Sequence, residues 1–308
     1  MSEGEMLIIK VPGSSANLGP GFDSIGLALN VYITLQVENA DHWEIIPISE
    51  HLNVFPKDET NYIIQIAMQT AEKYNQKLPG CKISVSSDIP LARGLGSSAA
   101  AIVAGIELAD SLCKLQLSDQ EKLELASRIE GHPDNVGASL LGGLIVGCQR
   151  GEEVSAEVFS HLALDVIAVV PKEELLTKES RGVLPSSLSY SDAVQAGAIG
   201  NVLIAALFSS NFELAGKMMK ADLYHHPYRK ELVPHMAIIE EKAIDLGAFG
   251  VALSGAGPTV LCLAEEGKGK ALAEGLSKLF PEMDCRSLKI DQAGSQVYTE
   301  SRNSLLCK

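Results

Sequence analysis

Apolar and polar residues follow one another in patterns that predict strands and helices along the whole chain. Every second residue is apolar over 31–37 and 81–87, which is typical of strands with one buried face. The stretch 43–48 is expected to pair with 31–37 across the polar residues 39–42. Further strands are expected over 6–11, 142–147, 164–170, 250–263 (in two pieces) and 285–290, and helices over 58–74, 99–109, 119–130, 190–208, 212–219, 233–246 and 268–279.

A polar, glycine-containing stretch at 149–153 lies between two apolar runs and favours a domain boundary there. With 308 residues the chain is long enough for two domains, expected over 1–150 and 151–308. Residues 292–308 offer no functional signal.

Charge, cysteine content and the length of apolar runs argue against several kinds of partner and cellular location. The chain has 39 acidic and 25 basic residues, a formal net charge of −14, which argues against nucleic acid or an anionic membrane as partner. Its six cysteines include no C-x-x-C pair, so a reducing cytoplasm is expected. The acidic N-terminus is unlike a signal peptide, and no run of roughly 18 apolar residues predicts a membrane span.

The sequence around residues 90–100, here called the glycine turn, is the strongest candidate for a binding site. It follows a predicted strand and runs into a predicted helix, and its two glycines, Gly94 and Gly96, allow a backbone with positive φ. Of the two serines that follow, one can cap the helix and the other can offer a hydroxyl to phosphate or metal. Amides at a positive helix end favour an anion, so the turn predicts a phosphate cradle.

Two other interpretations of the glycine turn are weaker. Gly94-x-Gly96-x-x-Ala99 also fits a dinucleotide pattern, but the acids downstream lie in helical sequence or its connecting turn instead of about 20 residues onward on a strand. The turn can also be an ordinary helix start with a capping residue.

Four further segments carry candidate polar groups. The stretch 12–23, with three glycines and two prolines, is expected to be a shaped loop, in which Asn17 closes a turn or is functional and Asp23 favours function. Glu130 ends a helix, where an acid opposes the helix dipole, so a bound cation would help to explain it. Residues 177–181 are expected to be a polar loop, and the pair at 225–226 to be surface histidines.

These motifs together resemble the GHMP kinases. Residues 90–100 are similar to the second motif of that family, residues 250–263 to the third, and residues 11–29 closely to the first motif of its homoserine kinase branch. The resemblance extends over nearly the whole chain. It implies an α+β fold in two domains: an N-terminal domain of the ribosomal protein S5 domain 2 type and a ferredoxin-like C-terminal domain.

The same resemblance implies roles for individual residues. ATP would be held by Pro90, Leu91, Ala92, Arg93, Gly94, Leu95, Gly96, Ser97, Ser98, Ala99 and Ala100, and by Asn61 at the adenine unless Asn61 only caps a helix. Mg²⁺ would be held by Ser98 and Glu130, with Glu124 as the alternative acid. L-Homoserine would be held by Asn17, Asp23, His132, Asn135, Arg181 and Arg229. Asp23 would orient the hydroxyl, with Asn17 beside it.

Other activities remain open on the sequence. The nearest is a GHMP kinase for another small alcohol; a catalytically silent nucleotide-binding relative and a nicotinamide-dependent oxidoreductase are more distant. A homodimer is also left open.

Overall fold

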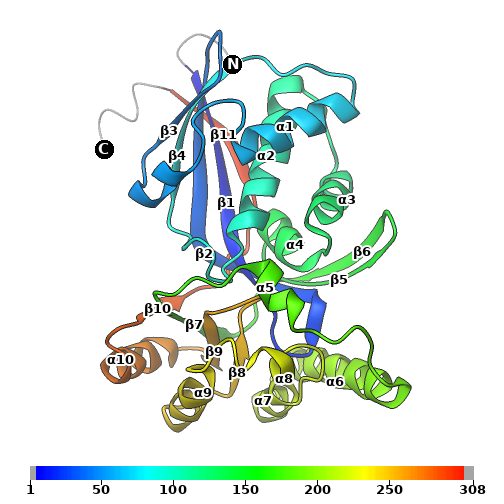
Figure 1. The fold of residues 1–308 in the computed structure, drawn as a ribbon, viewed down its shortest axis with the longest axis vertical. Coiled ribbons are helices and arrows are strands. Elements are labelled where there is room, and N and C mark those ends of the chain that lie inside the picture. Colours follow the sequence, from blue (N-terminus) through cyan, green and yellow to red (C-terminus); the bar gives the residue numbers. More distant parts are fainter. Residues whose placement is uncertain (1–4, 302–308) are drawn as a thin grey trace.

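The structure is a computed structural model that describes residues 5–301. It contains two mainly antiparallel sheets, each covered by helices (Figure 1). The first sheet has the strand order β11-β1-β2-β4-β3, with β5 paired to β2 and β6 paired to β5. Its strands are β1 (Glu5–Asn17), β2 (Gly21–Asn39), β3 (Glu44–Pro47), β4 (Cys81–Ser87), β5 (Leu144–Arg150), β6 (Glu153–Phe159) and β11 (Gln296–Ser301). Its helices are α1 (Tyr62–Lys73), α2 (Ser97–Cys113), α3 (Asp119–Glu130) and α4 (Asp134–Leu141), with a short 3₁₀ helix at Glu50–Val54.

The second sheet is fully antiparallel, in the order β10-β7-β9-β8. Its strands are β7 (Leu164–Val170), β8 (Gly250–Leu253), β9 (Val260–Glu265) and β10 (Asp284–Leu288). Its helices are α5 (Thr177–Gly182), α6 (Tyr190–Phe208), α7 (Phe212–Lys220), α8 (His226–Arg229), α9 (Met236–Asp245) and α10 (Gly269–Leu279). Counted in chain order, the strands lie 4-1-3-2 with helices after the first and third, so the expected ferredoxin-like arrangement is confirmed.

The expected loop at 12–23 is wrong, because most of it is strand. β1 and β2 stay paired through this stretch, and only residues 18–20 form the turn between them. The register shifts at Pro12/Gly13 and again at Ala16/Asn17. Such β-bulges accommodate glycine and proline while strand pairing continues, so the turn-forming residues here bend the strand and do not interrupt it.

Strand pairing differs from the expectation at β3. This strand lies parallel to β4 and does not form a hairpin with β2. The connection from β3 to β4 contains α1, and a crossover of that length allows parallel pairing.

The change from the first sheet to the second does not occur at the expected domain boundary between residues 150 and 151. That position lies in the hairpin turn between β5 and β6, both in the first sheet, and the second sheet begins at Leu164. β11 then returns from the C-terminal side to pair with β1, so the first domain is completed by the end of the described chain. The expected polar loop at 177–181 is the short helix α5, which lies at the junction of the two domains in Figure 1.

One described helix, α6, is long and apolar enough by length and composition alone to cross a membrane. Polar residues interrupt its apolar sequence, so it contains no unbroken apolar run of the length that predicts a span. Five of its residues, Ala196, Ile199, Leu203, Ala206 and Leu207, are buried in the fold. A core helix of a soluble protein passes the same test, so this is weak evidence for a membrane.

Candidate active site

Two cavities meet at the start of α2. The first, of about 290 Å³, is mainly apolar and lies beside β4 and α1; the second, of about 240 Å³, is polar and lies between the two domains. Ser97 and Ser98 line both. The other lining residues of the first cavity include Ile45, Leu52, Phe55, Asn61, Tyr62, Val85 and Leu91, and those of the second Asn17, Phe22, Asp23, Glu130, His132, Asn135, Thr177, Arg181 and Arg229. The glycine turn thus separates an apolar compartment from a charged one.

Glycine is required twice in the glycine turn. Gly94 and Gly96 have φ of 76° and 72°. A Cβ on Gly94 would lie 2.2 Å from the carbonyl oxygen of Ser254, and one on Gly96 2.3 Å from Oγ of Ser14. Gly96 is the N-cap of α2 and has no side chain with which to cap it, so the expected serine cap is wrong: both serines lie inside the helix. The first-turn amides are therefore left for a ligand.

The C-terminal domain holds the glycine turn in place. Ser254, between β8 and β9, donates from Oγ to the Gly94 carbonyl at 2.6 Å and bonds Oγ of Ser15 at 2.8 Å. The Leu95 carbonyl accepts from the Ser14 amide at 3.1 Å. These contacts join three distant segments, so both domains hold the glycine turn in position.

The structure divides the predicted nucleotide residues into two groups. Leu91, Ala92, Gly94, Gly96, Ser97, Ser98 and Asn61 line one or both cavities, whereas Pro90, Arg93, Leu95, Ala99 and Ala100 line neither. The Arg93 guanidinium instead bonds the carbonyls of Leu91, Pro171 and Lys172. Its side chain therefore ties the glycine turn to the segment before α5 and points away from the cradle.

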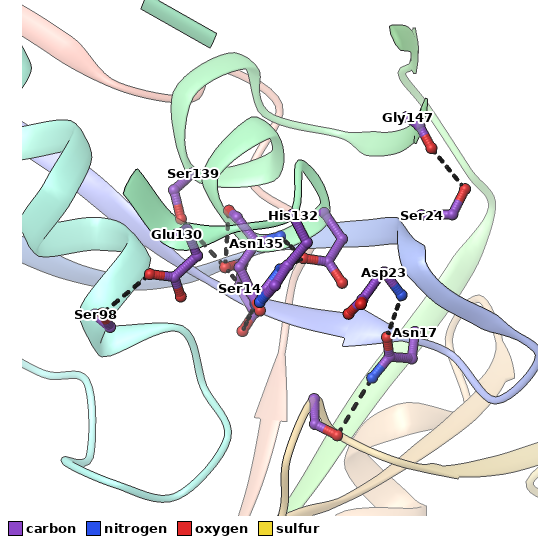
Figure 2. A network of polar contacts seen from close by, with 12 residues as sticks. Ser14, Asn17, Asp23, Ser24, Ser98, Glu130, His132, Asn135, Ser139 and Gly147 are labelled. Atoms are coloured by element: carbon purple, nitrogen blue, oxygen red, sulfur yellow. Dashed lines mark hydrogen bonds and ion pairs between the residues drawn. The ribbon is translucent and has the colours of Figure 1, made fainter. Parts of the chain in front are cut away.

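Asp23 and Arg181 form a bidentate ion pair in the polar cavity. The two Nη atoms of Arg181 lie 2.6 and 3.1 Å from the two carboxylate oxygens. Asp23 has a positive φ of 55°, and its amide donates to Oδ1 of Asn17 at 3.0 Å (Figure 2). Nδ2 of Asn17 donates to the Gly255 carbonyl at 3.3 Å, so Asn17 joins the main chain of Asp23 to the segment between β8 and β9.

The end of α3 places a second set of polar groups opposite the glycine turn. Oγ of Ser98 donates to Oε2 of Glu130 at 3.2 Å (Figure 2). Burial raises the pKa of Glu130, and the charge of His132 opposes that shift. Glu124, the alternative acid, bonds Gln120 and lines neither cavity. Only Glu130 of these two acids thus meets the serine hydroxyl.

His132 and Asn135 begin the next segment. Nδ1 of His132 bonds Oδ1 of Asp134 at 2.5 Å. Burial lowers the pKa of His132, but the hydrogen bond and the charge of Asp134 outweigh it, so the net shift is upward. Nδ2 of Asn135 donates to Oγ of Ser14 at 3.0 Å beneath the cavity.

Arg229 is the largest fully buried side chain of the described residues and lines the polar cavity. Its Nε donates to the Ser180 carbonyl at 3.0 Å, and Nη1 donates to the Gly255 carbonyl at 3.0 Å and faces Nδ1 of His225 at 3.2 Å. Burial and then the charge of Arg181 lower its pKa to about 10. The framework uses Nε and Nη1, which leaves Nη2 for a ligand.

Phe22 and His225 lie at this site although neither was predicted from the sequence to be part of it. The expected surface position of the paired histidines is wrong: His225 is completely buried. The Phe22 ring lies 5.5 Å from the His225 ring, and the guanidinium carbons of Arg181 and Arg229 lie 5.3 and 5.4 Å from its centre. The available signals were the place of Phe22 next to Asp23 and the four-residue spacing of His225 from Arg229 along a helical turn.

The buried histidine predicts a loss of stability in acid. Burial, followed by the charges of His226 and Arg229, lowers the pKa of His225 well below 6.5. Below pH 6.5 the His225 side chain of the unfolded protein therefore binds a proton, whereas that of the folded protein does not. The free energy of unfolding consequently falls as pH falls, by at most about 1.4 kcal/mol per pH unit. Urea denaturation between pH 7.5 and 5 measures this slope. The variant His225→Phe should show a shallower slope; an equal slope in both proteins contradicts the prediction.

Comparisons with known proteins agree with this geometry. The family model "GHMP kinases N terminal domain" matches residues 61–143 and "GHMP kinases C terminal" matches residues 203–282. A homoserine kinase of Bacillus velezensis is 51% identical over 298 residues, 96% of either chain, and one of Bacillus licheniformis is 49% identical over 99% of this chain and 100% of its own. The crystal structure of a homoserine kinase from Cytophaga hutchinsonii has a TM-score of 0.81 at 26% identity and covers 97% of this chain and 98% of its own. A mevalonate kinase from Methanococcus jannaschii, at 22% identity and a TM-score of 0.67 over 92% of this chain and 98% of its own, shows the same fold.

Proposed function

Since this chain belongs to the GHMP kinase family, we propose that it transfers the γ-phosphoryl group of ATP to the side-chain hydroxyl of L-homoserine, a step of threonine biosynthesis. Full-length relatives at about half identity are homoserine kinases, which supports this substrate. The structural observation that carries the proposal is the glycine-capped start of α2, which opens between an apolar cavity and a cavity lined by Asp23, Arg181 and Arg229.

The nucleotide would bind across both cavities. Its adenine fits the apolar cavity, because flat aromatic ligands bind in concave sites with apolar walls and few polar groups. Asn61 lines this cavity, but it also caps α1: its Oδ1 accepts from the Ile63 amide at 3.1 Å and its Nδ2 donates to the Pro56 carbonyl at 2.9 Å. The phosphates would lie on the first-turn amides of α2, where the helix dipole favours negative charge.

Ser98 and Glu130 fit a Mg²⁺ ion bound with the nucleotide. Mg²⁺ prefers oxygen ligands and keeps several waters, so one hydroxyl and one carboxylate beside the phosphates are a suitable protein contribution. Burial disfavours the charge of Glu130, and a bound cation would offset that cost. In phosphoryl transfer the ion neutralises charge on the β- and γ-phosphates.

The amino acid would lie between Asp23 and Arg229. Nη2 of Arg229 is left for the carboxylate, which would therefore bind this arginine through one nitrogen. Asp23 would accept the hydrogen bond of the substrate hydroxyl and aim its oxygen at the γ-phosphorus, while Asn17 holds the main chain of Asp23. His132 and Asn135 border the same cavity and would complete the amino-acid site.

The transfer itself needs position more than proton chemistry. The hydroxyl oxygen would form a bond to the γ-phosphorus while the bond from that phosphorus to the β–γ bridging oxygen breaks, leaving ADP. The hydroxyl proton would leave along its hydrogen bond to the Asp23 carboxylate and pass from there to water. Arg181 is close to both Asp23 and Glu130, so its charge would also stabilise the transferred group. Catalysis of this kind depends mainly on alignment and charge neutralisation.

An ADP-release assay with a panel of small alcohols tests the proposal. We expect turnover with L-homoserine and Mg²⁺-ATP to exceed that with L-serine, L-threonine and mevalonate by a large factor. Preference for another alcohol would assign a different GHMP activity, and ATP binding without turnover on any of them would indicate a silent relative.

Two matched variants test the proposed metal ligand. Glu130→Gln should raise the Mg²⁺ concentration for half-maximal activity roughly tenfold or more, because losing one charged ligand costs at least about 1.4 kcal/mol. Glu124→Gln removes the same charge from the same helix, away from Ser98, and should leave the Mg²⁺ dependence unchanged. The metal assignment is wrong if the two variants exchange these results.

A cytoplasmic location is part of the proposal. The cysteines at 81, 113, 148, 262 and 285 are all free thiols in the described structure, which supports a reducing compartment.

A further inference from the structure

His225 connects the two sides of the polar cavity. It begins the short segment that carries Arg229, and none of its side chain is exposed. Its Nε2 lies 2.9 Å from the carbonyl oxygen of Gly19, in the turn between β1 and β2. Its Nδ1 lies 3.2 Å from Nη1 of Arg229. The imidazole therefore bonds the turn that lies between Asn17 and Asp23 as well as the arginine beside the cavity.

The partners of His225 decide where its proton lies. An arginine nitrogen in a protein only donates, so Nδ1 of His225 must accept from Nη1 of Arg229. The single proton of the neutral ring is then on Nε2 and is donated to the Gly19 carbonyl. Asp222 faces this side of the ring with Oδ2 at 3.5 Å from Nε2, but that oxygen already accepts the amides of His225 and His226. The other titratable groups around His225 are the His226 ring, at 4.5 Å, and the charged side chains of Arg229 and Arg181.

The accepted hydrogen bond has a geometric consequence for Arg229. Nη1 has two hydrogens, and the Gly255 carbonyl and His225 take one each. Nε is held by the Ser180 carbonyl. Because a guanidinium is planar, three fixed N–H directions set the plane of the whole group and the direction of Nη2.

We propose that His225 is a positioning residue for the substrate carboxylate: as a neutral acceptor it orients Arg229 so that Nη2 points into the polar cavity. This inference rests on the proposed function, since it names the group that aims the carboxylate-binding arginine. His225 touches neither the transferred phosphate nor the hydroxyl, so its loss should weaken binding of the amino acid more than it slows the transfer.

Two conservative variants separate the two bonds of His225. The Oδ1 of asparagine replaces Nδ1 as an acceptor, so His225→Asn keeps the bond to Arg229 and loses the bond to Gly19. The amide of glutamine reaches the position of Nε2, so His225→Gln keeps the donor to Gly19 and lacks the acceptor. His225→Phe loses both. His226→Gln is the matched control, because the His226 ring accepts from the Leu253 amide and not from the guanidinium.

Steady-state kinetics and thermal melting test the proposal on the full chain. We expect His225→Gln and His225→Phe to raise the KM for L-homoserine about tenfold, because the charged Arg229 loses its buried acceptor in both variants. The kcat and the KM for ATP should change little. His225→Asn should restore the KM to near that of the wild type. His226→Gln should leave this KM unchanged even if it lowers Tm as much.

An ester of L-homoserine, which lacks the carboxylate charge, provides a readout that a purely structural role would not give. The variants should raise the KM of the acid and not that of the ester, because the ester has no carboxylate for Nη2 to bind. Equal increases for acid and ester, or a normal KM in His225→Gln, overturn the proposal. An inactive wild type would instead overturn the proposed function, so the two failures are distinguishable.

Discussion

Asp23→Asn is expected to lower kcat roughly 100-fold or more while the KM for ATP stays within about twofold, because misaligned reacting groups cost this much in rate. The aspartate lies beside the proposed path of the hydroxyl and away from the apolar cavity that would hold adenine. The amide retains one oxygen that can accept from Arg181, so the pair with Arg181 is weakened and not lost. Initial rates over a range of both substrates, followed by ADP release, measure the separation of kcat from KM.

Asp41→Asn is the control for this variant, because it removes the same charge from an exposed residue between β2 and β3. It should behave as the wild type. Normal turnover in Asp23→Asn would remove Asp23 from the mechanism, and a large loss of ATP affinity would place it at the nucleotide instead.

Gly96→Ala should nearly abolish ATP binding and destabilise the fold by about 1–3 kcal/mol. The added methyl group would lie 2.3 Å from Oγ, 2.8 Å from N and 2.9 Å from O of Ser14. The last two atoms belong to the backbone of β1, which cannot move aside. The residue also has a φ of 72°, which costs alanine further strain. Calorimetric titration with a non-hydrolysable ATP analogue measures the loss of affinity, and urea denaturation the loss of stability.

Gly197→Ala is the matched control for the same change. Gly197 lies inside α6, nothing lies within 4 Å of the position of its added Cβ, and alanine favours a helix over glycine by about 1 kcal/mol. We expect unchanged affinity and a small gain in stability. Normal ATP affinity in a folded Gly96→Ala protein would show that the nucleotide does not lie on the start of α2.

Local sequence was enough to predict many elements and part of the site. Alternation predicted β4, and a mostly apolar run predicted β7, both with their observed bounds, and the predicted helix over 119–130 matches α3. Each of these signals involves residues a few positions apart, whose preferences hold in almost any fold. For the same reason the glycine turn and the start of α2 could be located from sequence alone.

The family resemblance predicted further that Ser98 and Glu130 would lie together, which their hydrogen bond agrees with. It could not predict what each side chain does in the folded chain. Arg93 lies in the matching motif, yet its guanidinium bonds main-chain carbonyls of the other domain.

The sequence by itself therefore determined the elements, the position of the phosphate cradle and the kinds of polar group near it. Only the tertiary structure decided that the glycine-rich stretch before Asp23 continues two strands, that Arg181 pairs with Asp23, and that His225 is buried against Arg229. The physical reason is distance along the chain: Asp23 and Arg181 are 158 positions apart. Burial and pairing between such residues depend on how two sheets and their helices pack, and no local preference encodes that packing.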